Sequence, residues 1–366
     1  MTEEDILALL ALQHTPNIGD ITAKKLIAHC GSPAAIYKEK KHKIAHIERI
    51  GSTILQHLFD PIHRVAAEKE WQYIQDNHLS YHTFFDADYP ANLKQIIDAP
   101  IIFFSRGNID LKNKKTLSIV GTRQITSYGK AFCEKFVEEL SPLEDLVIIS
   151  GFAYGVDIAA HKAAMDNGLQ TIACLAHGLD IIYPASHKKY TKEVEAYGGF
   201  ITEFWHQSSF DRKNFIGRNR IIAGLSDATV VIESALKGGS LVTADIAFSY
   251  NREVFAVPGR TTDPYSMGCN ELIRNGKASL LTSAKDLIYQ LGWDTPAPKA
   301  VQQELFVTLS PEEETISAFL KANGKQSLDE LALECQMPIY QLSNLLFQME
   351  IKGVIKPLPG KRFEAI

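Results

Sequence analysis

Six short runs of mostly β-branched and apolar residues follow one another from Thr116 onward, each separated from the next by a stretch of helical periodicity. A run that is apolar at every position predicts a strand buried on both faces, and such strands alternating with amphipathic helices form mostly parallel sheets. We therefore expect an α/β fold with a Rossmann-like, doubly wound, mostly parallel sheet. The runs are residues 117–120, 146–149, 171–175, 200–202, 229–232 and 254–257.

The sequence on either side of this alternation predicts further domains. Residues 1–80 have helical periodicity and almost no strand signal, so we expect a helical domain there. The sheet domain is expected over residues 81–294, with the apolar run 101–104 as an edge strand. A proline-rich linker is expected over 295–308. Residues 309–366 have the pattern of three helices and a β-hairpin, which resembles a winged-helix domain.

Both flanking domains contain patterns that occur in DNA-binding proteins and in ordinary packing. Gly19 precedes a helix with Lys24 and Lys25, which resembles a helix-hairpin-helix or SAM-like domain whose backbone N–H groups receive a phosphate. The same pattern also arises where two helices simply pack, so DNA contact by this domain stays open. The third helix of the C-terminal domain, which starts near Pro338, is poor in lysine and arginine. Its composition favours protein contact or packing over recognition of a DNA groove.

Charge and cysteine usage exclude several classes of protein. The 366 residues include 38 Lys and Arg against 43 Asp and Glu, a net charge of −5, so any nucleic-acid site must be a local concentration of positive charge. The five scattered cysteines provide no paired zinc ligands and favour a reducing compartment. Because we find no basic leader and no apolar run long enough to span a bilayer, we expect a cytoplasmic protein without membrane contact.

Two turns that follow predicted strands have the composition of anion-binding sites. The first joins a strand to a helix with a glycine, a hydroxyl and an arginine, so N–H groups, the helix dipole and a guanidinium favour an anion there. The second is a Gly-Gly-Ser turn that opens a helix. Since neither a spaced-glycine dinucleotide loop nor a P-loop occurs, we expect no NAD or ATP cofactor. The residues of the two turns are Gly121, Thr122, Arg123, Gly238, Gly239 and Ser240.

A segment rich in positive charge precedes the fifth predicted strand. From Phe210 to Arg220, four basic residues and two aromatic rings occur with a single acid. Binding of single-stranded nucleic acid requires cations along the phosphate backbone and rings on which bases stack, although either ring also suits a protein core. The candidate binding residues of this segment are Arg212, Lys213, Phe215, Arg218, Asn219 and Arg220.

Asp157 and His161 lie one turn apart at the start of a predicted helix. An aspartate–histidine pair is typical of acid–base catalysis, and equally of a helix cap beside a hydrogen-bonded histidine. We favour the second interpretation because no serine or cysteine stands out in the sequence as the nucleophile of a triad.

Longer motifs occur in a fixed order between residues 118 and 278: SIVGTR, SGFAYGVD, RNRIIAGLSDATVVIE, KGGSLVTA, VFAVPG and GCNELIR. Together with the flanking domains they resemble the bacterial DNA-processing protein A family (DprA, also called Smf), over nearly the whole chain. The resemblance implies a non-catalytic protein, with no cofactor or metal, that binds single-stranded DNA and forms a homodimer. It also implies that the protein protects incoming strands during natural transformation and loads the RecA recombinase on them.

The resemblance also implies roles for residues in both anion turns and in the basic segment, which would contact the strand. The chain departs from the family at Gly217, where a basic residue is usual, and this departure predicts one weaker phosphate contact. The adjacent pair Arg212 and Lys213 would compensate for it.

One class of enzyme uses a similar Gly-Gly turn and is the alternative function. Lysine-decarboxylase-like phosphoribohydrolases need a carboxylate in the helix behind the turn. The fifth residue after Gly239 is Ala244, and Asp245 is displaced by about 100° around the helix. The sequence therefore favours strand binding over hydrolysis.

Apolar residues between 264 and 293 are candidates for the dimer interface. Several must cover a sheet face, and any that remain exposed would form the self-complementary patch that a two-fold dimer buries. The candidates are Tyr265, Met267, Leu272, Ile273, Leu280, Leu281, Leu287, Ile288 and Leu291.

Overall fold

The chain divides into two compact units, Met1–Ala297 and Pro298–Ile366, and each is described by itself. The expected linker lies outside the described residues. No helix in the described part of the chain is long and apolar enough to cross a membrane. The computed structural model describes residues 1–47, 50–208, 210–293, 309–358 and 360–365.

The larger unit is built on a sheet that has nine strands within the described residues, in the order β1-β2-β6-β5-β4-β3-β7-β8-β9. The pairs from β6 to β9 along this order are parallel, whereas β1 and β2 are antiparallel to each other and β2 is antiparallel to β6. The expected Rossmann-like, mostly parallel sheet is confirmed. The strands are β1 (Ser80–Thr83), β2 (Ile102–Gly107), β3 (Lys115–Val120), β4 (Leu146–Ser150), β5 (Gln170–Cys174), β6 (Gly198–Thr202), β7 (Ala228–Val231), β8 (Glu253–Ala256) and β9 (Ser279–Leu280).

The apolar strand expected at the sheet edge lies one position further in. Strand β1 occupies that edge instead and pairs antiparallel with β2. Its sequence, Ser-Tyr-His-Thr, has only Thr83 fully buried and no apolar alternation, so sequence alone gave no strand signal there. Pairing with β2 is what makes this polar segment a strand.

Helices cover both faces of the sheet, as a doubly wound fold requires. On one face Leu117 and Ile119 pack with α8, α9 and α14, and on the other Val147 and Ile149 pack with α11, α12 and α13. Leu146 and Ile148 of β4 belong to the first core, whereas Val147 and Ile149 belong to the second, so alternate residues of one strand face different cores. The helices of this region are α7 (Ala91–Lys94), α8 (Ser127–Leu140), α9 (Val156–Asp166), the 3₁₀ helix η1 (Ala185–Tyr190), α10 (Thr191–Tyr197), α11 (Arg212–Leu225), α12 (Gly239–Ser249), α13 (Met267–Arg274) and α14 (Ala284–Leu291).

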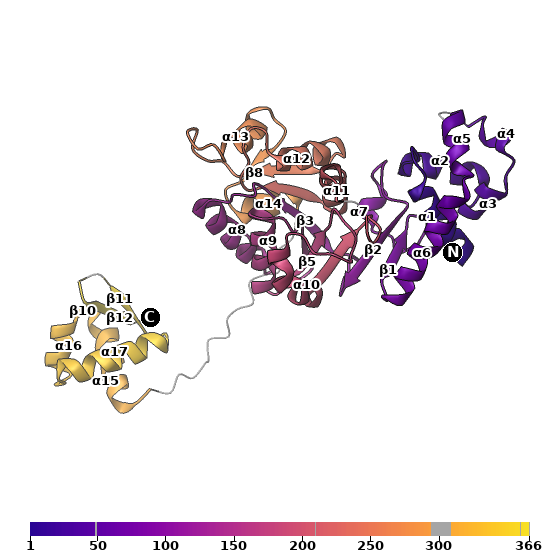
Figure 1. Ribbon diagram of the computed structural model, residues 1–366. Coiled ribbons are helices and arrows are strands. Elements are labelled where there is room, and N and C mark those ends of the chain that lie inside the picture. The colour runs from indigo at the N-terminus through magenta and orange to yellow at the C-terminus, as the bar shows by residue number, and fades with distance from the viewer. Residues whose placement is uncertain (48–49, 209, 294–308, 359, 366) are drawn as a thin grey trace. The chain divides into compact units, whose positions relative to one another are not determined.

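The N-terminal helices lie at one end of the sheet, beside β1 and β2 (Figure 1). Helix α1 is apolar over Ile6–Leu12 and is buried on all sides. Its side chains belong to the same hydrophobic cluster as Ile102, Phe104 and Phe200 of the sheet, so the helices and the sheet share a core. These helices are α1 (Glu3–His14), α2 (Asp20–Cys30), α3 (Pro33–Lys38), α4 (Lys41–Ile44), α5 (Ser52–Leu58) and α6 (Pro61–Asp76).

The smaller unit is a winged helix with a core of its own, which confirms the expected fold of the C-terminal segment. Ser310 and Ser327 start two of its helices with capping boxes. Helix α17 contains no lysine or arginine and exposes Tyr340, Phe347 and Ile351. The elements are α15 (Pro311–Asn323), β10 (Gln326–Ser327), α16 (Leu328–Glu334), α17 (Ile339–Ile351), β11 (Ile355–Leu358) and β12 (Arg362–Ala365).

Candidate nucleic-acid interface

A cavity of about 740 Å³ lies at the carboxyl end of β3, between helix α11 and the turns that follow β3 and β7. Strand β3 is where the strand order reverses, because β4 lies on one side of it and β7 on the other. In doubly wound sheets, ligands bind at such a switch point. The sequence candidates that line the cavity are Gly121, Thr122, Arg123, Arg212, Phe215, Arg218, Asn219, Gly238, Gly239 and Ser240.

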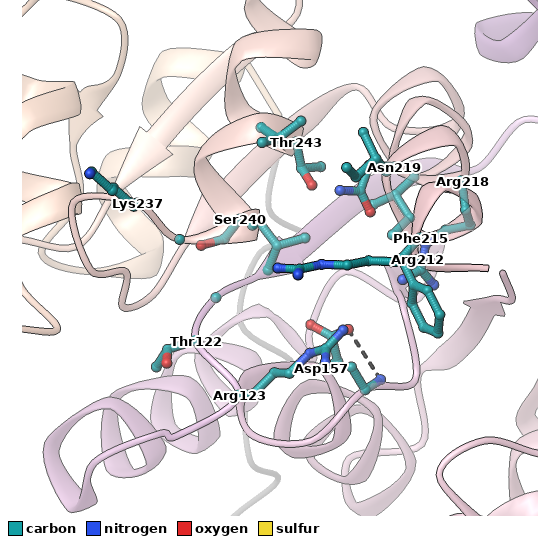
Figure 2. A pocket seen from close by; sticks show the side chains of 18 of the residues that line it. Thr122, Arg123, Asp157, Arg212, Phe215, Arg218, Asn219, Lys237, Ser240 and Thr243 are labelled. Carbon is teal, nitrogen blue, oxygen red and sulfur yellow. Dashed lines mark hydrogen bonds between the residues drawn. The ribbon is translucent and has the colours of Figure 1, made fainter. Parts of the chain in front are cut away.

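The turn after β3 is fixed by backbone hydrogen bonds. The Thr122 N–H donates to the Glu233 carbonyl (2.7 Å), and the Thr122 carbonyl accepts from the Val156 N–H (3.1 Å). Residue 121 must be glycine here, because a Cβ would lie 2.4 Å from Val156 Cγ2. The exposed Arg123 extends from this rigid turn into the cavity, with its guanidinium 5.6 Å from the centre of the Phe215 ring (Figure 2).

The start of α8 already has a partner within the protein. The buried Glu233 carboxylate accepts a hydrogen bond from the Thr126 N–H (2.9 Å), and the Thr126 hydroxyl accepts from the Gly129 N–H (3.1 Å). Glu233 thus occupies the helix end where the sequence predicted that the dipole would favour an external anion. The positive charge available at this turn is that of Arg123.

The turn after β7 brings backbone donors to the edge of the cavity. Gly238 caps α12 without a side-chain hydrogen bond, and the Ser240 hydroxyl donates to the Ser234 hydroxyl (2.8 Å). No group in the described part of the chain accepts a hydrogen bond from the N–H of Gly239 or Ser240. A Cβ added at Gly239 would meet no atom within 4 Å, so a ligand can approach the backbone closely. The first turn of this eleven-residue helix can therefore bind a phosphate.

Helix α11 turns one face toward the cavity, with Arg212, Phe215 and Asn219 on it. The Arg212 side chain extends across the cavity in front of the two turns (Figure 2). Lys213 lies two positions before Phe215, about 200° around the helix. It is exposed and does not line the cavity. The structure therefore does not bring Lys213 to the other candidates.

Arg218 lines the cavity floor, but its hydrogen bonds are internal. One terminal nitrogen donates to the carbonyls of Gly151 (2.7 Å) and Cys174, at the ends of β4 and β5. Burial lowers the pKa of this guanidinium and raises the pKa of Asp157 beside it, and the attraction between the two charges opposes both shifts. Arg218 therefore organises the floor, which departs from the expected role of an open phosphate-binding cation.

Arg220 is a second departure from the expected binding set, because its charge is used inside the protein. Its guanidinium forms ion pairs with Asp20 (2.9 Å) and Glu203 and donates to the Asp98 carbonyl. Asp20, the first residue of α2, also accepts the Ile101 N–H (2.8 Å). The hairpin that resembles a helix-hairpin-helix thus packs against the sheet region through its helix start, which supports the packing interpretation.

The Asp157–His161 pair does not form a catalytic dyad. His161 is fully buried, and its Nδ1 lies 2.7 Å from the Thr171 hydroxyl. Burial lowers its pKa to about 3, so the ring is neutral. Asp157 accepts the Ala153 N–H (3.2 Å) and holds the loop after β4. This agrees with the interpretation favoured from the sequence, except that Gly155 is the N-cap.

The carboxylate that a phosphoribohydrolase would need is also absent from the wall formed by α12. Ala244 is buried, and the exposed Asp245 forms an ion pair with Lys277 (2.7 Å). Among the described residues that line the cavity, Asp157 is the one carboxylate.

Family models match most of this architecture. The DNA recombination-mediator protein A model matches residues 80–292, and the DprA winged helix domain matches residues 295–361. The chain belongs to the DprA family. It is 38% identical over 231 residues to DNA processing protein DprA of Streptococcus pneumoniae, covering 61% of this chain and 80% of that protein. It is 28% identical to protein Smf of a Synechocystis species over 97% of both chains.

Two solved DprA structures are similar to this one. The crystal structure of the Streptococcus pneumoniae protein has a TM-score of 0.68 at 31% identity, covering 79% of this chain and 98% of that one. The Helicobacter pylori protein, whose structure is described as giving insight into its single-stranded DNA binding mode, has a TM-score of 0.53 at 30% identity. That match covers 60% of this chain and 99% of that one.

The cavity of this DprA-family chain also has lining residues that sequence reasoning did not select. Lys237 and Thr243 flank the Gly-Gly-Ser turn, and Tyr183 and Phe210 add two rings beside Phe215. Lys237 adjoins the Gly-Gly-Ser turn, and Phe210 lies inside the basic segment. Both residues could therefore have been predicted from the sequence. Tyr183 comes from the loop after β5, and only the folded sheet brings it to α11.

Proposed function

We propose that this DprA-family protein binds single-stranded DNA in the cavity between α11 and the turns after β3 and β7, without catalysing a reaction. Arg123, Arg212 and the start of α12 hold phosphates, and Phe215 receives a base. Phosphates and base faces are common to all sequences, so binding has little sequence preference. Lys237 adds a third exposed cation to the wall.

The observation that carries this proposal is the meeting of a cationic turn, an open helix start and an aromatic ring at one switch point of the sheet. The cavity lies in a chain with a net charge of −5, so its positive wall is a local feature. The single-stranded DNA binding described for the Helicobacter pylori relative supports the same assignment.

A salt titration with single-stranded and duplex DNA of equal length tests the proposal. Each phosphate neutralised on a single strand contributes about −0.7 to the slope of log K against log salt, so three cations predict a slope of about −2. We expect that slope and clearly weaker binding to duplex. A flat salt response, or equal affinity for the two forms, would overturn the proposal.

The proposal includes a role in recombination. The protein protects the strand and passes it to RecA, and a homodimer presents two cavities to one strand. Family membership supports this role, and exposed apolar residues near β9 support the dimer. The direct measurement is RecA filament formation on single strands covered by a single-strand-binding protein. Addition of this protein should shorten the lag, and an unchanged lag would contradict RecA loading while leaving strand binding intact.

A further inference from the structure

Three aromatic rings form one cluster on the cavity wall. Tyr183 and Phe210 have ring centres 4.6 Å apart, Phe210 and Phe215 5.2 Å, and Tyr183 and Phe215 5.9 Å. All three line the cavity. They come from two places in the sequence, the loop after β5 and the start of α11, so the fold itself assembles them.

Two of these rings are too exposed to be explained as core. Tyr183 is 41% exposed and Phe210 is 50% exposed, whereas core aromatic residues such as Phe136 and Phe152 are at most 2% exposed. Phe210 is supported by the buried His177, whose ring lies 6.2 Å away and nearly parallel to it, at 25°. Exposed rings fixed beside a cation-lined cavity are the arrangement on which bases stack.

The ring planes are strongly inclined to one another. The angle is 63° between Tyr183 and Phe210, 70° between Phe210 and Phe215, and 72° between Tyr183 and Phe215. A base stacked on Phe215 and a base stacked on either other ring therefore cannot lie parallel. Two successive bases held in this way would be splayed apart. A flexible single strand can adopt this geometry, whereas the stacked bases of a duplex cannot.

We propose that Tyr183 and Phe210 form a second nucleobase subsite beside Phe215, so that the cavity separates two successive bases of one strand. This inference rests on the proposed binding of single-stranded DNA and adds to it a reason for discrimination against duplex. The phosphates are held beside these rings, by Arg123, Arg212 and the start of α12.

Affinity measurements on matched variants test the subsite. Phe210→Leu and Tyr183→Leu remove a ring, while Tyr183→Phe keeps the ring and loses only the hydroxyl. Phe248→Leu removes a ring that is 52% exposed on α12 and does not line the cavity. A lost stack of about 1–3 kcal/mol corresponds to about 5- to 150-fold weaker binding. We expect that loss for the two cavity leucine variants, with an unchanged salt slope, and wild-type affinity for Phe248→Leu. Tyr183→Phe should recover the affinity that Tyr183→Leu loses, because it restores the ring.

A spectroscopic probe tests the splaying without depending on any variant. Two adjacent 2-aminopurines in a single strand give a long-wavelength circular dichroism signal that requires them to stack on each other. Binding of the wild-type protein should abolish this signal at one register of the pair along a short strand, and Phe210→Leu should retain it. A signal that persists at every register with wild-type protein would overturn the inference.

The outcomes separate the inference from the proposed function. Wild-type affinity in both cavity leucine variants would overturn the subsite, whereas the wild-type protein would still bind the strand. Failure of the wild-type protein itself to bind would overturn the proposed function as well. Thermal unfolding of each variant shows whether a loss of affinity comes from a loss of fold. For a variant that does not fold, the 2-aminopurine signal with the wild-type protein tests the subsite instead.

Discussion

At the scale of single residues, Arg123 and Phe215 interact across the cavity, so charge and stacking are coupled there. Arg123→Ala should lower the magnitude of the salt slope by up to about 0.7, because one phosphate contact is lost. Phe215→Ala should weaken binding by about 1–3 kcal/mol with little change of slope, since a stacked base releases no counterion. The Arg123 guanidinium lies 5.6 Å from the centre of the Phe215 ring, so the double variant should lose less than the sum. Titrations of all four proteins measure this, and strict additivity would contradict the coupling.

At Gly217 the resemblance to the family led us to expect a basic residue, and the position of this glycine predicts a small functional effect. It lies two positions from both Phe215 and Asn219, about 200° around α11 from the cavity face, and a Cβ there would meet no atom within 4 Å. Gly217→Ala and Gly217→Lys should each stabilise the fold by about 0.5–1 kcal/mol, because glycine disfavours a helix interior.

Denaturant unfolding measures that gain, and DNA titration provides the second readout. Both variants should bind single strands with the wild-type salt slope. A slope steeper by about 0.7 in Gly217→Lys alone would show that the lysine reaches a phosphate and that the strand also contacts this side of the helix.

At the scale of elements, Arg220 joins three of them: it ties α11 to the start of α2 and the end of β6. The arrangement places the two carboxylates of Asp20 and Glu203 around one guanidinium. Burial raises the pKa of Glu203 to about 7 from its ordinary value of 4.5, against the pull of Arg220. The folded protein therefore holds a proton that the unfolded chain releases at lower pH.

The sign of the pH dependence follows from that shift. The contribution of Glu203 to stability is present below about pH 4.5 and is lost as pH rises toward about 7, at no more than about 1.4 kcal/mol per pH unit. Glu203→Gln keeps the size of the side chain and removes the titration. Denaturant unfolding of both proteins across this range should show a flatter profile for the variant. Parallel profiles would mean that Glu203 does not titrate there.

The elements differ in how far the sequence could predict them. Strands such as β4 and β7 were predictable because each is a continuous apolar run, and burial on both faces leaves no other placement. Strand β1 was not, since its polar sequence becomes a strand only by pairing with β2. The arginines of α11 show the same limit. The motif indicates positive charge, but whether Arg220 meets a phosphate or Asp20 depends on a residue 200 positions away in the sequence.

At the scale of the whole molecule, the candidate binding residues all belong to the larger unit, and the winged helix has a separate core. Its helix α17 lacks cations, and the exposed Tyr340, Phe347 and Ile351 fall within about 20° of one line along the helix. This composition continues to favour contact with protein over a DNA groove. DNA binding and partner binding are thus expected from different units of the chain.

The proposed homodimer is the last property that belongs to the whole molecule. Of the apolar residues proposed for its interface, Leu272, Leu281 and Leu287 are buried, while Met267 is 39% and Leu280 51% exposed. Leu280 lies on β9, a two-residue strand at the sheet edge, where a second copy can approach along a two-fold axis. Tyr289 of α14, which the sequence did not single out, is 90% exposed.

Leu280→Arg should therefore give a folded monomer that binds single strands more weakly, because two linked cavities on one strand bind with avidity that a single cavity lacks. Light scattering at tens of micromolar protein measures the mass, and the same sample is used for DNA titration. Ile62→Arg places the same charge on an apolar residue of α6 that is 60% exposed, and it should leave both the dimer and the affinity unchanged. A wild-type protein that is monomeric under these conditions would contradict the dimer. A dimer that persists in Leu280→Arg would place the interface on another surface, since an arginine at the centre of a closed apolar contact would remain buried and unpaired.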